Sequence, residues 1–114
     1  MPRGVVKMSS SKISFSSTKI VVTYDLSNND ISAQEIADAS EGVFDTYISI
    51  SRVGNFHLPN TTLVSSNNIT AESAVAKFKQ AFRAAKGRKY YSSCSISRIF
   101  ACEVDGKSGY IENN

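Results

Sequence analysis

The segment from Lys19 to Leu26, early in the chain, is rich in apolar residues. Alternate positions from Ile20 onward form one apolar face, and the opposite face, which carries Val21 and Thr23, is also poorly suited to water. A strand that is apolar on both sides is typical of the centre of a sheet with both faces covered. We therefore expect this segment to be the central strand of the fold.

The residues that follow this strand predict a turn and then a helix. Ser-Asn-Asn-Asp is typical of a turn. Ser32 and Glu35 have the spacing of a capping box, in which each side chain binds the backbone N–H of the other residue, and Ile31 and Ile36 flank it as a hydrophobic staple. We expect a short helix that begins here and ends near Gly42.

The clearest helix lies between Thr70 and Gly87. Thr70 is placed to cap the N-terminus, Glu72 lies in the first turn where the helix dipole favours an anion, and Lys86 lies in the last turn, before Gly87 as the C-cap. Apolar residues recur at the i, i+3, i+4, i+7 spacing of a core-facing helix. This face consists of Ala71, Ala74, Val75, Phe78, Ala81, Phe82 and Ala85.

Alternating apolar and polar residues predict three further strands. They run from Phe44 to about Val53, from Thr61 to Ser65, and from Tyr90 to Val104, and the segment between Gly54 and Asn60 is expected to be a loop. The longest of the three should present one apolar face, made of Cys94, Ile96, Phe100, Cys102 and Val104.

The order strand–helix–strand–strand–helix–strand predicts an α+β protein with the ferredoxin-like βαββαβ arrangement, an antiparallel sheet with two helices on one face. Short extra strands are indicated at Ile13 and, at the C-terminus, at Tyr110–Ile111. We expect residues 1–12 to be a flexible basic tail and residues 13–114 to be a single ferredoxin-like domain. Because the other sheet face would be open, we expect a second copy to cover it in a homodimer.

Composition limits the number of domains and the cellular compartment that we expect. A chain of 114 residues allows one domain with a modest core, and the net charge of +3 equals the charge of the three basic residues in the first twelve. Neither a membrane-spanning run nor a secretory leader is evident, so we expect a cytoplasmic protein. Cys94 and Cys102 would lie roughly 26 Å apart along a straight strand, too far to pair, and both are expected to be buried thiols in a reducing compartment.

Six basic residues occur between Lys77 and Lys89, and no acidic residue occurs between Glu72 and Glu103. With Tyr90 nearby, such a cluster can bind a nucleic-acid backbone. The simpler explanation, which we prefer at this point, is that the basic helix lies beside the acidic first helix within the fold. The candidate nucleic-acid-binding residues are Lys79, Arg83, Lys86, Arg88 and Lys89.

A short motif at the end of the first strand, Val22 to Leu26 (VTYDL), resembles the "YDL/YDI" signature of the small CRISPR adaptation subunit, the partner of the integrase, and of VapD-like proteins. The segments Leu58–Ser66 and Thr70–Ser73 are similar to the third strand and second helix of relatives in that superfamily. The resemblance covers about Lys19 to Val104 in element order. It implies a ferredoxin-like homodimer with Asp25 near the two-fold axis.

The resemblance also implies a site at Asp25. In some members this aspartate and its symmetry mate are proposed to hold a divalent metal, Mg²⁺ or Mn²⁺, for cleavage of RNA or DNA, which would make Asp25 both the catalytic residue and the metal ligand. In other members the dimer is a non-catalytic scaffold for duplex DNA. The chain departs from the family pattern because no Lys or Arg occurs between Asp25 and Asp45, and because Leu63 stands where tryptophan is frequent. Independently of the family, Asp25 could simply cap the turn that follows it.

Two hypotheses therefore stand. One is a nucleic-acid-processing protein, a metal-dependent endonuclease centred on Asp25. The other is a non-catalytic dimeric module that binds or scaffolds a protein or nucleic-acid partner. The single histidine, His57, lies in the expected loop without a nearby acid or cysteine in sequence, so we do not assign it a catalytic role.

Overall fold

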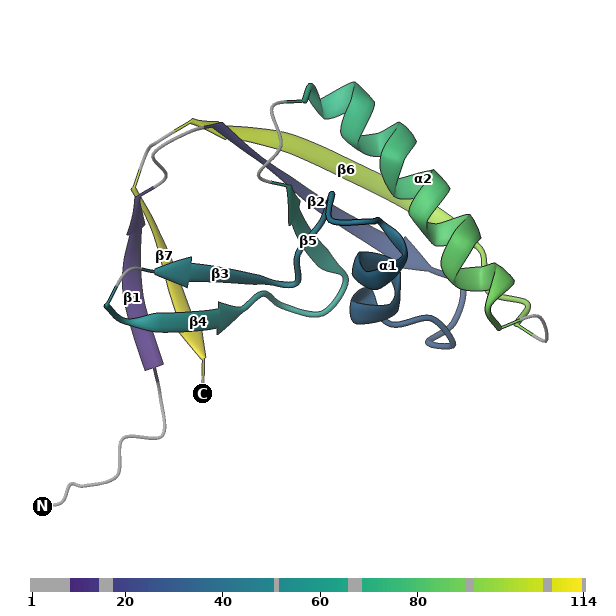
Figure 1. Ribbon diagram of the computed structural model, residues 1–114, viewed down its shortest axis with the longest axis horizontal. Helices are drawn as coiled ribbons and strands as arrows, with labels where there is room; N and C mark the ends of the chain where they lie inside the picture. The colour runs from purple at the N-terminus through teal and green to yellow at the C-terminus, as the bar shows by residue number, and fades with distance from the viewer. Residues whose placement is uncertain are drawn as a thin grey trace, which may run out of the picture.

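The computed structural model describes residues 9–14, 18–50, 52–65, 69–89, 92–105 and 108–113. It is a mixed α+β fold with two helices and antiparallel sheets (Figure 1). In chain order the elements are β1 (Ser9–Ser14), β2 (Thr18–Leu26), α1 (Ala33–Ala39), β3 (Tyr47–Ile50), β4 (Gly54–His57), β5 (Thr62–Ser65), α2 (Ala71–Gly87), β6 (Ile96–Asp105) and β7 (Ser108–Asn113).

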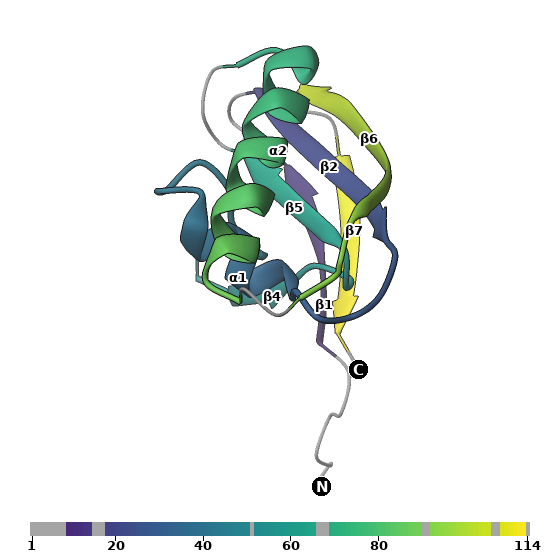
Figure 2. The ribbon, with the colours of Figure 1, turned by 90° about the vertical axis from the view of Figure 1, so that its right-hand side faces the viewer.

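The central sheet has the order β5-β2-β6, and both pairings are antiparallel. The prediction of β2 as the central strand is therefore confirmed. Ile20, Val22 and Tyr24 on one face of β2 are buried in the main core together with side chains from both helices. Figure 2 shows α2 lying across this face of the sheet. On the other face of β2, Thr23 is exposed and Val21 is half-buried, so within the described chain that face is not fully covered.

Both helices begin at the caps that the sequence predicts. Ser32 and Glu35 form the complete capping box of α1, and the Thr70 hydroxyl accepts a hydrogen bond from the backbone N–H of Ser73 at the start of α2. The predicted ends need correction. The last residue of α1 is Ala39 rather than a residue near Gly42, and α2 is capped by Arg88 in a right-handed conformation, with Gly87 still inside the helix.

The segment from Phe44 to Val53 does not form one continuous strand. Phe44 is buried in the main core, and Asp45 makes an isolated antiparallel bridge to Val64 on β5. Regular strand pairing begins only at Tyr47, where β3 pairs with β4 instead of β5.

The predicted loop from Gly54 to Asn60 is wrong for its first half, because Gly54 to His57 form β4. The β3–β4 hairpin is stabilised by a small apolar cluster of its own around Phe56, which packs against Ile48, Ile50 and Leu58. The backbone of Gly54 has a φ of 128°, which a residue with a Cβ rarely adopts.

The N- and C-terminal strands β1 and β7 pair antiparallel as a separate ribbon at the end of the molecule opposite to the helices (Figure 1). Residues 9–12, which the sequence assigns to the flexible tail, therefore lie in a strand, while residues 1–8 lie outside the described residues. The predicted extra strands at Ile13 and Tyr110–Ile111 are confirmed.

The predicted apolar face of the last long strand is wrong, because its residues lie on two different faces of the sheet. The pairing of β2 with β6 shifts register between Asp25 and Leu26, so Leu26 pairs with Ile96 and Asp25 pairs with Arg98. This irregularity inserts a residue into β6 and exchanges its two faces at that point. Cys94 is buried and Ile96 packs against the core, whereas Phe100 and Cys102 are exposed on the opposite face. The prediction that both cysteines are buried therefore holds only for Cys94.

The α+β class, the antiparallel pairing and the two helices are confirmed. The ferredoxin-like order is not confirmed, since the central sheet has three strands and the β3–β4 hairpin is a separate sheet. Among the described residues, no helix is both long and apolar enough to cross a membrane.

Candidate functional site

The Asp25 carboxylate lies at the end of β2 on the sheet face that the helices leave open. Its register partner on β6 is Arg98, and the Arg98 Nε atom lies 3.2 Å from Asp25 Oδ2. The side chains are 62% and 79% exposed respectively, so water screens this ion pair and it contributes at most about 1 kcal/mol to stability. Arg98 therefore lies beside Asp25 across the sheet, although no Lys or Arg occurs between Asp25 and Asp45 in the sequence.

The turn after Asp25 has its own capping group. The Asn28 side-chain oxygen accepts a hydrogen bond from the backbone N–H of Asp30 at 2.9 Å, and the Ser27 hydroxyl accepts one from the N–H of Ser95 at 2.9 Å. In the part of the chain that the structure describes, the Asp25 carboxylate is bound by Arg98 and not by the turn. The interpretation of Asp25 as the cap of this turn is therefore wrong.

A cleft of about 480 Å³ opens beside Asp25, between the end of β2, the start of α1 and the loop before β5. Polar side chains from Asn28, Asn29, Ser32 and Asn60 line it together with apolar groups. Tyr24 also lines the cleft, and its hydroxyl is buried without a hydrogen-bond partner among the described residues. Burial raises the pKa of the Tyr24 phenol to about 12, so this group stays neutral at physiological pH.

Asp25 is the residue to which the resemblance assigns a metal ion. Among the described residues, no three His, Cys, Asp or Glu side chains lie together in a way that could hold a metal ion. Mg²⁺ or Mn²⁺ requires several oxygen ligands. Among the described residues that line the cleft, Asp25 is the one acidic residue, and its carboxylate is paired with Arg98. In the site that the resemblance implies, the second carboxylate would come from Asp25 of another chain.

The basic residues of α2 fall into two groups. Lys89, just beyond the helix, is bound within the fold: its Nζ atom lies 2.9 Å from Glu35 Oε2 and donates a hydrogen bond to the backbone oxygen of Asp30 at 2.7 Å. The pKa of Glu35 is lowered, first by the hydrogen bond from the Ser32 backbone N–H and then by Lys89. Lys89 is therefore a structural link between α2 and the acidic α1 segment, and we withdraw it from the candidate binding residues.

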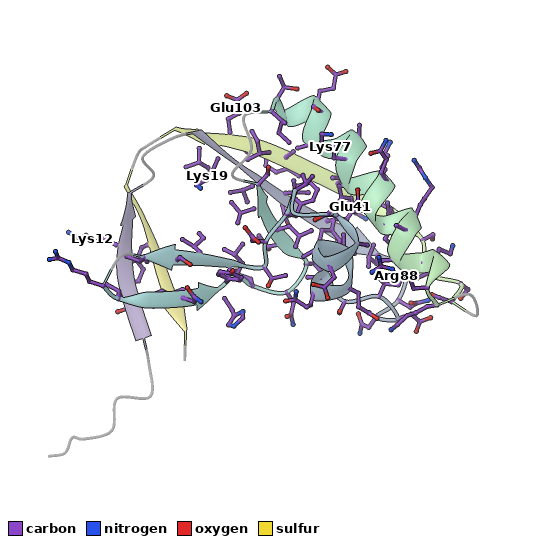
Figure 3. The ribbon with its side chains drawn as sticks, in the orientation of Figure 1. Lys12, Lys19, Glu41, Lys77, Arg88 and Glu103 are labelled. Carbon is purple, nitrogen blue, oxygen red and sulfur yellow. The ribbon has the colours of Figure 1, made fainter. Side chains whose placement is uncertain are left out.

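The other predicted binding residues remain available to a ligand. Lys79, Arg83 and Arg88 are exposed and Lys86 is half-buried, and among the described residues their side chains make no ion pair or hydrogen bond. Figure 3 shows Arg88 at the end of α2 and Lys77 farther along the same helix. Charge neutralisation by the acidic first helix, the simpler explanation, therefore accounts for Lys89 and not for these four residues.

Three residues of functional interest were missed by the sequence-based prediction. Arg98 is distant from Asp25 in sequence, and only the pairing of β2 with β6 brings the two together. Phe100 and Cys102 were assigned to a buried face, whereas the β6 irregularity places them on the open one. His57 lies exposed on β4, with its ring 6.2 Å from that of Tyr47 and away from the cleft residues.

Comparisons with protein-family models, with curated proteins and with solved structures found no match to this chain.

Proposed function

We propose that this chain is a non-catalytic, dimeric nucleic-acid-binding module that contacts the phosphate backbone through α2. The observation that carries the proposal is the set of four cations on and just after α2, Lys79, Arg83, Lys86 and Arg88, which no acidic group of the described chain neutralises. Exposed cations clustered along one helix attract phosphate and release the counterions condensed on it.

The spacing of these cations supports a contact with a linear polyanion. Lys79, Arg83 and Lys86 are separated by four and three residues, so they share one face of the helix, with rises of about 6 Å and 4.5 Å between them. Arg88 follows the last turn and lies about 180° around the helix axis from Lys79, so it is outside this face. Glu72, the one acidic residue of α2, lies at the other end of the helix.

The proposed fold is ferredoxin-like in its central part. The support is the spatial order β6-β2-β5, extended by the bridge from Val64 to Asp45. On this interpretation the segment around Asp45 is a second sheet strand reduced to a single bridge, and β1, β7 and the β3–β4 hairpin are additions.

We also propose that the protein is a homodimer in the cytoplasm. The open face of the central sheet carries exposed apolar side chains and suits a second copy, and the free thiols of Cys94 and Cys102 suit a reducing compartment. The endonuclease hypothesis receives less support, because the Asp25 carboxylate is paired with Arg98.

The binding proposal predicts a strong dependence on salt. We expect native protein to bind labelled duplex DNA or single-stranded RNA in a fluorescence-anisotropy titration, and Lys79→Ala/Arg83→Ala to bind at least tenfold more weakly. The slope of log K against log salt should fall by about 1 for each removed cation. The half-buried Lys77 lies on a different face of the same helix, so Lys77→Ala is the matched control and should bind as the native protein does.

Two results would contradict this proposal. Equal binding by the native protein and the double variant would show that α2 is not the contact surface. Cleavage of RNA or DNA in the presence of Mg²⁺ or Mn²⁺ by native protein, abolished in Asp25→Asn, would instead establish the endonuclease. We expect neither protein to cleave.

A further inference from the structure

The cleft beside Asp25 has a size and a lining that suit a small polar ligand. Its volume of about 480 Å³ lies within the range of roughly 300–1,000 Å³ that small-molecule sites occupy. Two separate segments contribute amide side chains to its walls, the turn that carries Asn28 and Asn29 and the loop that carries Asn60. The fold therefore brings together amide groups that are distant in the sequence.

The amide groups of the cleft are only partly used within the fold. Asn28 Oδ1 accepts a hydrogen bond from the backbone N–H of Asp30 at 2.9 Å, which leaves the Asn28 amide nitrogen as a donor. In the described chain the side chains of Asn29 and Asn60 make no hydrogen bond, and both residues are exposed. Each of these amides has donors and an acceptor. A ligand with donors and acceptors along one edge can therefore bind here.

Tyr24 adds a buried donor at the wall of the cleft. The residue is 2% exposed, and its hydroxyl has no hydrogen-bond partner among the described residues. A buried hydroxyl without a partner costs free energy, which a ligand acceptor can recover. Because the hydroxyl is covered in the free chain, a ligand reaches it through a small local movement of the lining.

The loop that carries Asn60 is held in an unusual conformation. Thr61 has a φ of 61°, which β-branched residues rarely adopt. The backbone oxygen of Thr61 accepts a hydrogen bond from the backbone N–H of Tyr24 at 3.2 Å, so the loop is tied to the end of β2. Strained backbone of this kind is concentrated at ligand-binding and active sites. Here it holds Asn60 beside the cleft.

The charge of the lining favours a neutral ligand. Among the described residues that line the cleft none is Lys or Arg, and the carboxylate of Asp25 is paired with Arg98. A neutral ring with donors and acceptors on its edge suits this lining, and a nucleobase is such a ring. Asparagine binds adenine through two hydrogen bonds, whereas guanine is most often bound by Arg or Lys. The lining therefore favours adenine.

The end of α2 adjoins the cleft. Lys89 donates a hydrogen bond to the backbone oxygen of Asp30, the residue that follows Asn29 in the turn. Arg88, the residue before Lys89, is exposed at the end of the helix (Figure 3) and makes no ion pair in the described chain. A nucleic-acid strand with a phosphate on Arg88 can therefore place a neighbouring base at the cleft.

We propose that the cleft beside Asp25 binds an unpaired adenine base, with the amides of Asn29 and Asn60 on the edge of the base and the Tyr24 hydroxyl as a donor to one of its ring nitrogens. The inference rests on the nucleic-acid binding of the proposed function and specifies a base that this binding reads. A duplex still contacts α2, but one of its bases must leave the stack before it can fill the cleft. A single strand that contains adenine should therefore bind more tightly than a strand of uracil alone with the same length and charge.

The first test uses free adenosine, which carries no phosphate. In an NMR titration of ¹⁵N-labelled native protein, the backbone signals of Asn29 and Asn60 should shift. Tyr24→Phe keeps the ring and should weaken adenosine binding about three- to tenfold, the effect of losing one neutral hydrogen bond. Tyr47→Phe is the matched control, since Tyr47 is exposed on β3 and does not line the cleft, and it should bind as the native protein does.

Three results would overturn the proposal. The cleft signals could stay unchanged up to the solubility limit of adenosine, Tyr24→Phe could bind adenosine as tightly as native protein, or guanosine could bind as tightly as adenosine. Asn60→Ala supplies a second variant and should also weaken adenosine binding. Its control is Asn55→Ala, which changes an exposed asparagine of β4 outside the cleft.

The second test separates the cleft from the basic helix. Lys79→Ala/Arg83→Ala should bind free adenosine as tightly as native protein, because a nucleoside has no phosphate for α2 to contact, and should bind single-stranded RNA more weakly. Salt-dependent RNA binding without any binding of adenosine would overturn the cleft proposal alone. Adenosine binding together with equal RNA binding by the native protein and the double variant would overturn the contact through α2 alone.

Discussion

At the scale of single residues, Tyr24 has the most unusual environment. Its ring lies 4.6 Å from that of Phe78 in the core, yet its hydroxyl is buried without a hydrogen-bond partner among the described residues. A buried hydroxyl that has lost its hydrogen bonds to water and gained none costs free energy, whereas the ring itself stabilises the fold by packing. The ring of Tyr24 therefore stabilises the fold, and its hydroxyl destabilises it.

We expect Tyr24→Phe to raise the free energy of unfolding by about 1 kcal/mol, because it removes the unpaired hydroxyl and keeps the ring. The variant should also change the pH dependence. The folded-state pKa of about 12 exceeds the ordinary value of 10.0, so native protein holds this proton more tightly than the unfolded chain and loses stability as pH rises from 10 to 12. Urea denaturation from pH 8 to 12 should show a shallower loss for Tyr24→Phe. A less stable variant at pH 8 would show that the hydroxyl has a partner.

At the scale of elements, the sequence predicts the features that depend on residues close together in the chain. It does not predict those that depend on residues far apart. The caps at Ser32 and Thr70 act on backbone groups within three residues, so the sequence alone identified both helix starts. The β3–β4 hairpin depends on one buried residue, Phe56, and was missed because a single apolar side chain in four residues gives no periodic pattern.

The candidate site shows the same division between local and long-range signals. The cations of α2 could be identified as candidates from their positions in the sequence, and Asp25 from the resemblance of the motif that contains it. The pairing of Asp25 with Arg98, the exposure of Phe100 and the use of Lys89 within the fold could not. Each of these depends on which strands and helices become neighbours, and the first two depend on the shift in register of β6.

Two glycines in different elements allow the effect of a Gly→Ala substitution to be compared. Gly54 has a φ of 128° in the β3–β4 hairpin, and Gly87 ends α2 without a positive φ; a Cβ would meet no atom within 4 Å at either position. Backbone conformation alone should therefore determine the outcome. We expect Gly54→Ala to lower the free energy of unfolding by about 1–3 kcal/mol. We expect Gly87→Ala to raise it by up to about 1 kcal/mol, and chemical denaturation measures both changes. Changes of the same sign at both positions would contradict this account.

At the scale of the whole molecule, apolar and basic surfaces lie on opposite sides of one thin sheet. The helices cover the face formed by Ile20, Val22 and Tyr24, and the exposed apolar residues Phe100 and Cys102 lie on the other. A module with this layout can join a second copy through one face and keep α2 accessible on the other. The three-stranded sheet separates the open face from α2, so a change on the open face is expected to leave the proposed binding of a single nucleic acid unaltered.

The position of both helices on one side of the sheet has a further consequence. When two such sheets stack through their open faces, the two α2 helices lie on opposite outer sides of the dimer. The dimer then has two separate binding sites for nucleic acid. It can tether two separate duplexes, or two distant parts of one molecule, and the second contact then forms at high effective concentration. Energy transfer between a donor-labelled and an acceptor-labelled duplex should therefore appear with native protein and disappear with Phe100→Asp, which places a charge on the open face, while each duplex still binds. The proposed dimer would then crosslink nucleic-acid segments.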